Sequence, residues 1–175
     1  ALELVENSLN DFMSDDTKRL LVMSFHGWTG IGKTFMTTIL SRHIYTPSVH
    51  RIIVPLHFPH DSEDEAYRKV MQDTLTSNIS SCAVTLFIID EMDKATPGVI
   101  LGLESAISEI RGMSLNNSRV IIILVSNTGG AAINRYVFRH LENGYDREKL
   151  TASGLVKGIL SDEVEAEWIH HLQQG

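Results

Sequence analysis

The stretch Gly27-Trp28-Thr29-Gly30-Ile31-Gly32-Lys33-Thr34 decides the fold of this chain. It fits the pattern G-x-x-x-x-G-K-[ST], in which glycines let successive backbone N–H groups turn inward around phosphate groups. In this pattern Lys33 reaches the β- and γ-phosphates as a mobile positive charge, and the hydroxyl of Thr34 binds Mg²⁺. A chance glycine turn before a helix would need all of these neighbours to coincide. We therefore interpret residues 27–34 as a nucleotide-binding P-loop.

The flanks of this loop have the structure that its chemistry requires. Leu20 to Phe25 is an apolar run of strand length. After the loop, apolar residues at helical spacing predict one face of a helix: Met36, Ile39, Leu40, His43 and Ile44. A helix that begins here presents its positive end to the phosphates. We expect the loop from Gly27 to Phe35 to bind ATP, with backbone N–H groups of residues 30–35 and Lys33 holding the phosphates.

Strands and helices alternate along the rest of the chain, which predicts a mainly parallel sheet with helices on both faces. A helix is expected before the first strand, from the spacing of Leu2, Val5, Leu9 and Phe12. Further strands are expected at 51–56, 84–89 and 120–125, a turn at 116–118, and helical pieces from Ala131 onward, with no convincing fifth strand. Pro55 suggests that the second strand ends early or lies near an edge.

Two more helices are expected between these strands. Asp61 or Ser62 would cap the first of them. Its inward face would consist of Tyr67, Val70, Met71 and Leu75. Pro97 suits the first turn of the second helix. Its apolar positions are Val99, Leu103, Ile107 and Ile110.

An acidic pair ends the strand at 84–89. The run Leu86-Phe87-Ile88-Ile89-Asp90-Glu91 is a Walker B pattern, whose carboxyl end can face the phosphates in a parallel sheet. Asp90 would hold Mg²⁺ mostly through water molecules bound to the metal. Glu91 would activate the water that attacks the phosphate. Acids at a strand end are often simply solvated, but the P-loop favours the catalytic interpretation.

Asn127 follows the strand at 120–125 and is the third candidate catalytic residue, with Lys33 and Glu91. An asparagine after a strand is commonly a turn former. At the end of a third strand of a P-loop sheet, however, its amide can orient water or bind the γ-phosphate. We expect Asn127 to report the presence of the γ-phosphate.

Composition sets limits on the overall class. The 175 residues correspond to about one domain. With 43% apolar and 21% charged residues, the composition is that of a folded globular protein. The net charge of −7, without a lysine or arginine block, argues against nucleic-acid binding. The longest apolar run, 120–125, is far shorter than the ~18 residues of a membrane helix.

Several motifs together resemble the torsins, AAA+ ATPases of the endoplasmic reticulum lumen and nuclear envelope. The matching segments are Ser24 to Gly30, Leu56-His57-Phe58-Pro59-His60, Asp90-Glu91-Met92-Asp93-Lys94 and Ser126-Asn127. The resemblance implies that Lys33 is the Walker A lysine, Asp90 and Glu91 the Walker B pair, and Asn127 the sensor 1 residue. It gives Asp93 and Lys94 no catalytic role.

The resemblance implies a three-layer P-loop NTPase sandwich, the large subdomain of an AAA+ module. Residues 1–160 would form this nucleotide-binding subdomain and 161–175 a helical tail, the helical lid being absent. Animal torsins commonly carry asparagine where this chain has Thr34, so metal binding here would be more conventional. Two glycosylation sequons begin at Asn78 and Asn116, and only the one at Asn78 has a counterpart in torsins.

Partners and location follow from the resemblance alone. Torsins lack their own arginine finger and are stimulated by membrane-anchored lumenal activators of the lamina-associated polypeptide type. Nothing in the sequence places Arg111, Arg135, Arg139 or Arg147 at a neighbour's active site. We thus expect a slow, activator-dependent ATPase that remodels proteins in the endoplasmic reticulum lumen or nuclear envelope as a chaperone. Homo-oligomerisation and the protein substrate are left open.

Two alternatives belong to other classes. The first is a nucleotide-gated binding module, which uses ATP to switch its affinity for the activator and hydrolyses it negligibly. The second is a P-loop kinase, which the acid pair Asp90-Glu91 makes weaker because it suits water activation better than transfer to a bound acceptor.

Overall fold

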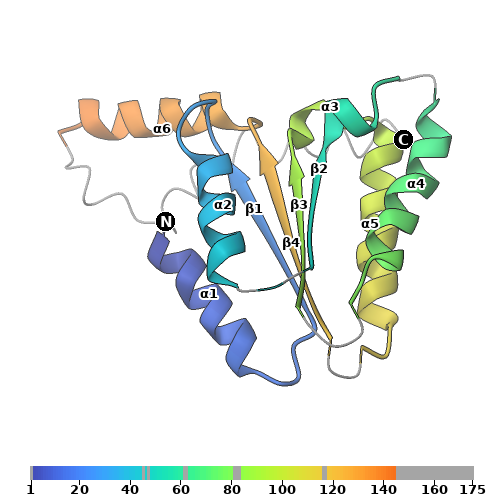
Figure 1. Cartoon of the computed structure of the whole chain (residues 1–175). Helices are drawn as coiled ribbons and strands as arrows, with labels where there is room; N and C mark the ends of the chain where they lie inside the picture. The colour runs from blue at the N-terminus through green and yellow to red at the C-terminus, as the bar shows by residue number, and fades with distance from the viewer. Residues whose placement is uncertain are drawn as a thin grey trace.

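A parallel four-stranded sheet lies between two layers of helices (Figure 1). The computed structural model describes residues 2–44, 46, 48–60, 63–80, 84–115 and 118–144. The strand order is β1-β4-β3-β2. The strands are β1 (Leu20–His26), β2 (Ser48–Ile53), β3 (Val84–Asp90) and β4 (Arg119–Ser126). The expected α/β fold with a parallel sheet and helices on both faces is confirmed.

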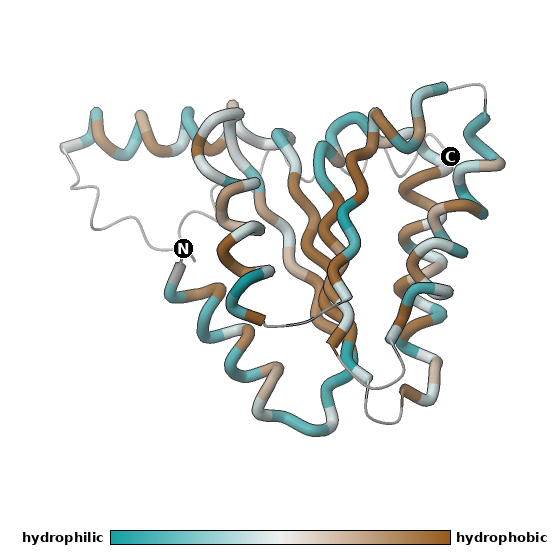
Figure 2. Tube along the Cα trace, in the orientation of Figure 1, coloured by the Kyte–Doolittle hydropathy of each residue, from teal (hydrophilic) through white to brown (hydrophobic). Residues whose placement is uncertain are grey.

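The register aligns the carboxyl ends of the strands that carry the candidate site. His26 pairs with Ser126 at the end of β1 and β4, and Ile53 pairs with Asp90 at the end of β2 and β3. The central strands β3 and β4 are buried along nearly their whole length, as their unbroken apolar runs require (Figure 2). The residues that follow these strands therefore emerge together at one edge of the sheet.

Helices α1 (Leu2–Ser14) and α2 (Lys33–His43) cover one face of the sheet. Successive strand residues point to opposite faces, and those on this side pack against Leu9, Phe12 and Leu40 of the two helices. The strand residues of this core are Leu86, Ile88, Ile121, Ile123 and Val125. In helix α2 the expected apolar face is only partly right, because Ile39 and His43 are exposed.

Helices α4 (Asp64–Ser77) and α5 (Pro97–Gly112) cover the opposite face. Pro97 lies in the first turn of α5, as expected. Of the inward positions expected on α4, Tyr67, Met71 and Leu75 are buried. Val70 is 49% exposed, so that assignment is wrong. The buried residues recur at every fourth position, which keeps them on a narrower stripe than the one expected.

The second strand differs from its expected range. It runs over 48–53 rather than 51–56, and Val54–His57 forms the one-turn helix α3. Pro55 lies in the first turn of this helix, where its missing N–H costs nothing and its fixed φ suits the helix. Pro55 was thus a correct sign that the strand ends early, and β2 is an edge strand.

Other connections complete the fold. The 3₁₀ turn η2 (Met92–Lys94) follows β3, and α6 (Gly130–Glu142) follows β4. The expected cap at Asp61 or Ser62, most of the turn at 116–118 and the helical tail beyond residue 144 lie outside the described residues. The structure has Glu63 as the N-cap of α4. Within the described ranges the sheet has four strands, and no helix there is long and apolar enough to cross a membrane.

Arg119 connects the start of β4 to the end of α1. Its guanidinium donates to the carbonyls of Phe12 and Met13, at 3.2 and 2.6 Å, and forms an ion pair of 2.7 Å with Asp16. The last carbonyls of a helix have no partner within the helix, so Arg119 satisfies two of them from the sheet. This anchors α1 beside β1 and α2.

Candidate nucleotide-binding site

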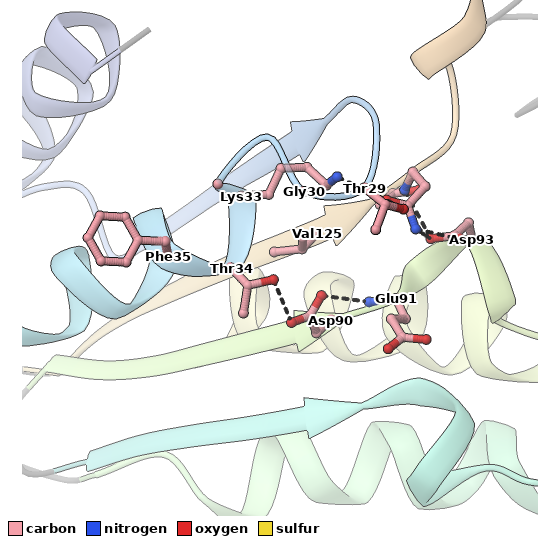
Figure 3. A pocket seen from close by; sticks show the side chains of 12 residues that line it. Thr29, Gly30, Lys33, Thr34, Phe35, Asp90, Glu91, Asp93 and Val125 are labelled. Carbon is pink, nitrogen blue, oxygen red and sulfur yellow. Dashed lines mark hydrogen bonds between the residues drawn. The ribbon is translucent and has the colours of Figure 1, made fainter.

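A pocket of about 440 Å³ lies at the carboxyl ends of β1, β3 and β4 (Figure 3). Residues from the P-loop, the end of β3 and the end of β4 line it: Thr29, Gly30, Gly32, Lys33, Thr34, Phe35, Asp90, Glu91, Asp93, Val125, Ser126 and Asn127. The three candidate catalytic residues and both candidate metal ligands are among them. Segments far apart in the sequence therefore meet in one cavity.

The P-loop has the backbone conformation that its glycines allow. Gly30 and Gly32 have φ values of +84° and +95°, which disfavour residues with a side chain. A Cβ at either position would meet no atom within 4 Å, so space is open in front of the loop. Gly32 is also the N-cap of α2, and no side chain caps this helix end. The first N–H groups of α2 are thus placed for an anion.

Lys33 has its ammonium group inside the loop. Nζ donates to the carbonyls of Gly27 and Trp28, at 2.7 and 2.8 Å, and to Oδ1 of Asn127 at 2.9 Å. Burial lowers the pKa of Lys33, while the charges of Asp93 and Asp90 act to raise it. The ammonium is held by oxygen atoms of the protein at the place where phosphate oxygens would be its partners.

Thr34 and Asp90 meet at the other side of the pocket. The Thr34 hydroxyl donates to Oδ2 of Asp90 at 3.2 Å. Hydroxyl and carboxylate oxygens suit Mg²⁺, which keeps several waters and takes substrate oxygens as ligands. Among the described residues no group of three His, Cys, Asp or Glu could hold a metal alone. The residues present therefore fit a magnesium ion that is bound together with phosphate groups.

Arg51 of β2 also faces Asp90. Its guanidinium lies 3.6 Å from Oδ2 of Asp90 and donates to the Thr37 hydroxyl at 3.2 Å. Sequence reasoning missed this cation, because only the pairing of β2 with β3 places it beside the acid. Arg51 neutralises part of the charge of the candidate metal ligand.

Glu91 has an unusual backbone conformation. Its φ of 60° makes it the only non-glycine residue with positive φ in the described part of the chain. Its backbone N–H donates to Oδ1 of Asp90 at 3.0 Å, which stabilises the turn. A non-glycine residue in the left-handed region costs free energy, and such residues cluster at functional sites. The exposed carboxylate is directed by this turn rather than by the strand.

Asn127 is bound by Asp93, to which the sequence analysis gave no catalytic role. Its backbone N–H donates to Oδ1 of Asp93 at 3.0 Å, and Nδ2 lies 3.3 Å from both carboxylate oxygens. Burial would raise the pKa of Asp93, but the hydrogen bonds from Asn127, together with Lys94, hold it below its ordinary value. The sequence does not indicate that Asp93 lies at the pocket, because it follows the end of the strand and only the η2 turn brings it back there.

Three residues of the predicted nucleotide-binding loop do not line the pocket. Gly27 and Trp28 contribute carbonyls to Lys33, as described above. Ile31 lines a second, mostly apolar hollow of about 580 Å³ between α1, β1 and α2, which also includes Gly32 and Lys33. Trp28 and Phe35 are 51% and 69% exposed.

The structure describes one of the two candidate glycosylation sites. Asn78 is exposed at the end of α4, where its Nδ2 donates to the carbonyl of Thr74 at 2.8 Å. Modification of Asn78 stays a prediction. Asn116 lies outside the described residues, as does Arg147.

The fold and this pocket define a class of protein: a P-loop NTPase with the large-subdomain architecture of AAA+ proteins. The family model of the torsins matches residues 1–89. Torsin-3A of Mus musculus is 32% identical over 157 residues, which cover 85% of this chain and 40% of that protein. The chain therefore belongs to the torsin family, whose members are related to AAA+ ATPases, and it spans less than half the length of that relative.

Proposed function

We propose that this chain binds ATP with Mg²⁺ and hydrolyses it slowly. The observation that carries the proposal is the meeting of Lys33, Thr34, Asp90, Glu91 and Asn127 around one pocket. The apolar hollow that shares Gly32 and Lys33 with this pocket supports a nucleotide over free phosphate, because it provides a surface for a base beside the phosphate site.

Each residue has a role that its place in the pocket supports. Lys33 and the N–H groups at the start of α2 would hold the phosphates, while Thr34 and Asp90 would hold Mg²⁺, which supplies charge neutralisation of the phosphate oxygens. Glu91 would accept a proton from the water that attacks the γ-phosphorus. The bond from that phosphorus to the β–γ bridging oxygen then breaks, and ADP leaves with the bond's electron pair.

A partner would complete the site. Among the described residues that line the pocket there is no arginine. An arginine supplied by a partner is worth about 10³–10⁵ in rate in related reactions. We propose a membrane-anchored lumenal activator of the lamina-associated polypeptide type, in keeping with the torsin resemblance. The same resemblance underlies the proposals of residence in the endoplasmic reticulum lumen or nuclear envelope and of protein remodelling.

Calorimetric titration with Mg-ATP tests nucleotide binding. The wild-type chain is expected to give saturable heat, and Lys33→Ala is expected to abolish it. Lys69→Ala removes an exposed lysine of α4 and serves as the matched control. If the folded wild-type chain gives no heat, or if Lys33→Ala binds like wild type, ATP binding at this loop is wrong.

Turnover is tested separately with Glu91→Gln. In the presence of the activator's lumenal domain, this variant is expected to lose phosphate release by about 10²-fold or more while it still binds Mg-ATP. Unchanged phosphate release would contradict the role of Glu91. Binding without any activator-stimulated release in wild type would favour the nucleotide-gated binding module instead.

A further inference from the structure

We propose that Asp93 is a positioning residue: it fixes the side-chain amide of Asn127 so that the carbonyl oxygen faces the P-loop lysine. This proposal rests on the proposed ATP-binding function and adds a residue to its site. Asp93 does not contact Lys33 by hydrogen bonding in the structure. It acts through Asn127, which it holds from the side of the turn that follows β3.

The contact involves two groups of Asn127. The carboxylate of Asp93 accepts from the backbone N–H at 3.0 Å and from Nδ2 at 3.3 Å. The Asp93 side chain is 14% exposed. A largely buried, ionised acceptor makes stronger hydrogen bonds than a neutral one, and the lowered pKa of Asp93 agrees with this arrangement. The end of β4 is thus attached to the turn after β3.

The charges of Asp93 and Lys33, on opposite sides of the amide, together decide which way it points. With Nδ2 toward the carboxylate, Oδ1 accepts from Lys33 at 2.9 Å and from the Thr29 hydroxyl at 3.3 Å. The flipped amide would set Oδ1 against the carboxylate and Nδ2 against the ammonium, so that both contacts would become repulsive. The observed orientation is therefore the one that satisfies both charged neighbours.

This orientation assigns Asn127 a specific task. Its carbonyl oxygen holds the ammonium of Lys33 in the pocket that Asp90 and Glu91 also line. The amide thus acts on the phosphates through the lysine. Asp93 keeps this acceptor in place before a nucleotide arrives, which lowers the reorganisation that binding requires.

A double-mutant cycle on Mg-ATP affinity tests the inference. Asp93→Asn keeps the shape of the side chain but removes its charge, and with the charge the preference for one orientation of the Asn127 amide. We expect it to weaken Mg-ATP binding about tenfold in the wild-type background and less than about twofold in the Asn127→Ala background. Asp73→Asn, at an exposed position of α4, is the control. Equal losses in both backgrounds would show a merely structural role and overturn the proposal.

A second measurement does not depend on ATP. In the nucleotide-free chain, Asp93→Ala removes both acceptor oxygens, and the backbone N–H of Asn127 is expected to exchange with solvent at least about tenfold faster by NMR. Neighbouring amides in β4 should keep their protection, which excludes general unfolding. Unchanged exchange would overturn the proposal even if ATP binds. Absence of ATP binding in wild type, with faster exchange in the variant, would instead count against the proposed function.

Discussion

Nζ of Lys33 lies 2.9 Å from Oδ1 of Asn127, a residue 94 positions later in the chain. The contact joins the loop after β1 to the residue after β4, the neighbouring strand of the sheet. Together with two loop carbonyls, it satisfies the ammonium with protein oxygen atoms. A nucleotide would therefore take the place of the two loop carbonyls around Nζ, while Oδ1 of Asn127 keeps the ammonium in the pocket.

The hydroxyl of Thr34 provides a first prediction. Thr34→Val removes the only hydrogen-bonding atom of a side chain that lies 3.2 Å from Asp90, with little change in shape. The gain in ATP affinity on adding Mg²⁺ is expected to shrink by about tenfold, because a charged or metal-bound partner makes such a contact strong. Calorimetry with and without EDTA measures this gain. Thr34→Ser keeps the hydroxyl and should behave like wild type; a full Mg²⁺ effect in Thr34→Val would contradict the metal role.

Arg51 provides a second prediction, in which the substitution makes Mg²⁺ more effective instead of less. Its guanidinium is 3.6 Å from the candidate metal ligand Asp90 and reduces the negative charge that Mg²⁺ meets. Arg51→Gln is expected to lower the Mg²⁺ concentration needed for half-maximal ATP binding by about two- to fivefold, a modest effect because the side chain is one-third exposed. Arg42→Gln, at an exposed position in the last turn of α2, is the control. A higher Mg²⁺ requirement would show that Arg51 instead orients Asp90.

His26 links stability to pH. Burial lowers its pKa below the ordinary 6.5, a hydrogen bond to the Thr128 carbonyl opposes this, and the charge of Lys33 lowers it further. As pH falls through 6.5, the unfolded chain binds a proton while the folded protein stays neutral at this site. Protonation therefore favours the unfolded chain, and stability is lost as pH falls from 6.5 toward the folded pKa.

The measurement compares the free energy of unfolding at about pH 7.5 and about pH 5 by urea denaturation. His26→Gln is expected to lose less stability than wild type over this interval. His43→Gln removes an exposed histidine and controls for the loss of one titrating group. The explanation fails if wild type and His26→Gln lose the same free energy.

Two glycines of α5, one crowded and one open, form a matched pair of positions that tests how closely α4 and α5 pack. A Cβ at Gly102 would lie 2.3 Å from the carbonyl oxygen of Arg68, so α4 and α5 would have to move apart. Gly102→Ala should therefore destabilise the fold by about 1–3 kcal/mol. Gly112→Ala, where a Cβ would meet no atom within 4 Å, should be neutral or stabilise by up to about 1 kcal/mol. Denaturant unfolding of both variants measures the difference; similar values would contradict the close approach.

Sequence patterns predicted the features that depend on local residue types. The P-loop, the acid pair and the buried strands β3 and β4 each have a local signature, and the parallel sheet follows from their order along the chain. Arg51, Asp93 and Arg119 were missed because their roles depend on pairing between distant segments. The range of the second strand was wrong because Val54–His57 forms a helical turn where an extended chain was expected, although Pro55 did indicate that the strand ends early.

The sheet order also determines when the pocket can form. β1 pairs in the sheet with β4, so the partner of Leu20 is Val120, a hundred positions later in the chain. β2 and β3, and the α4–α5 pair that packs beside them, are much closer in sequence. Contacts between distant segments close larger loops and form more slowly. During synthesis, the segment that carries the P-loop emerges before β3 and β4 yet joins the sheet only after β4 has been made, so the candidate phosphate site is incomplete until the rest of the sheet is in place.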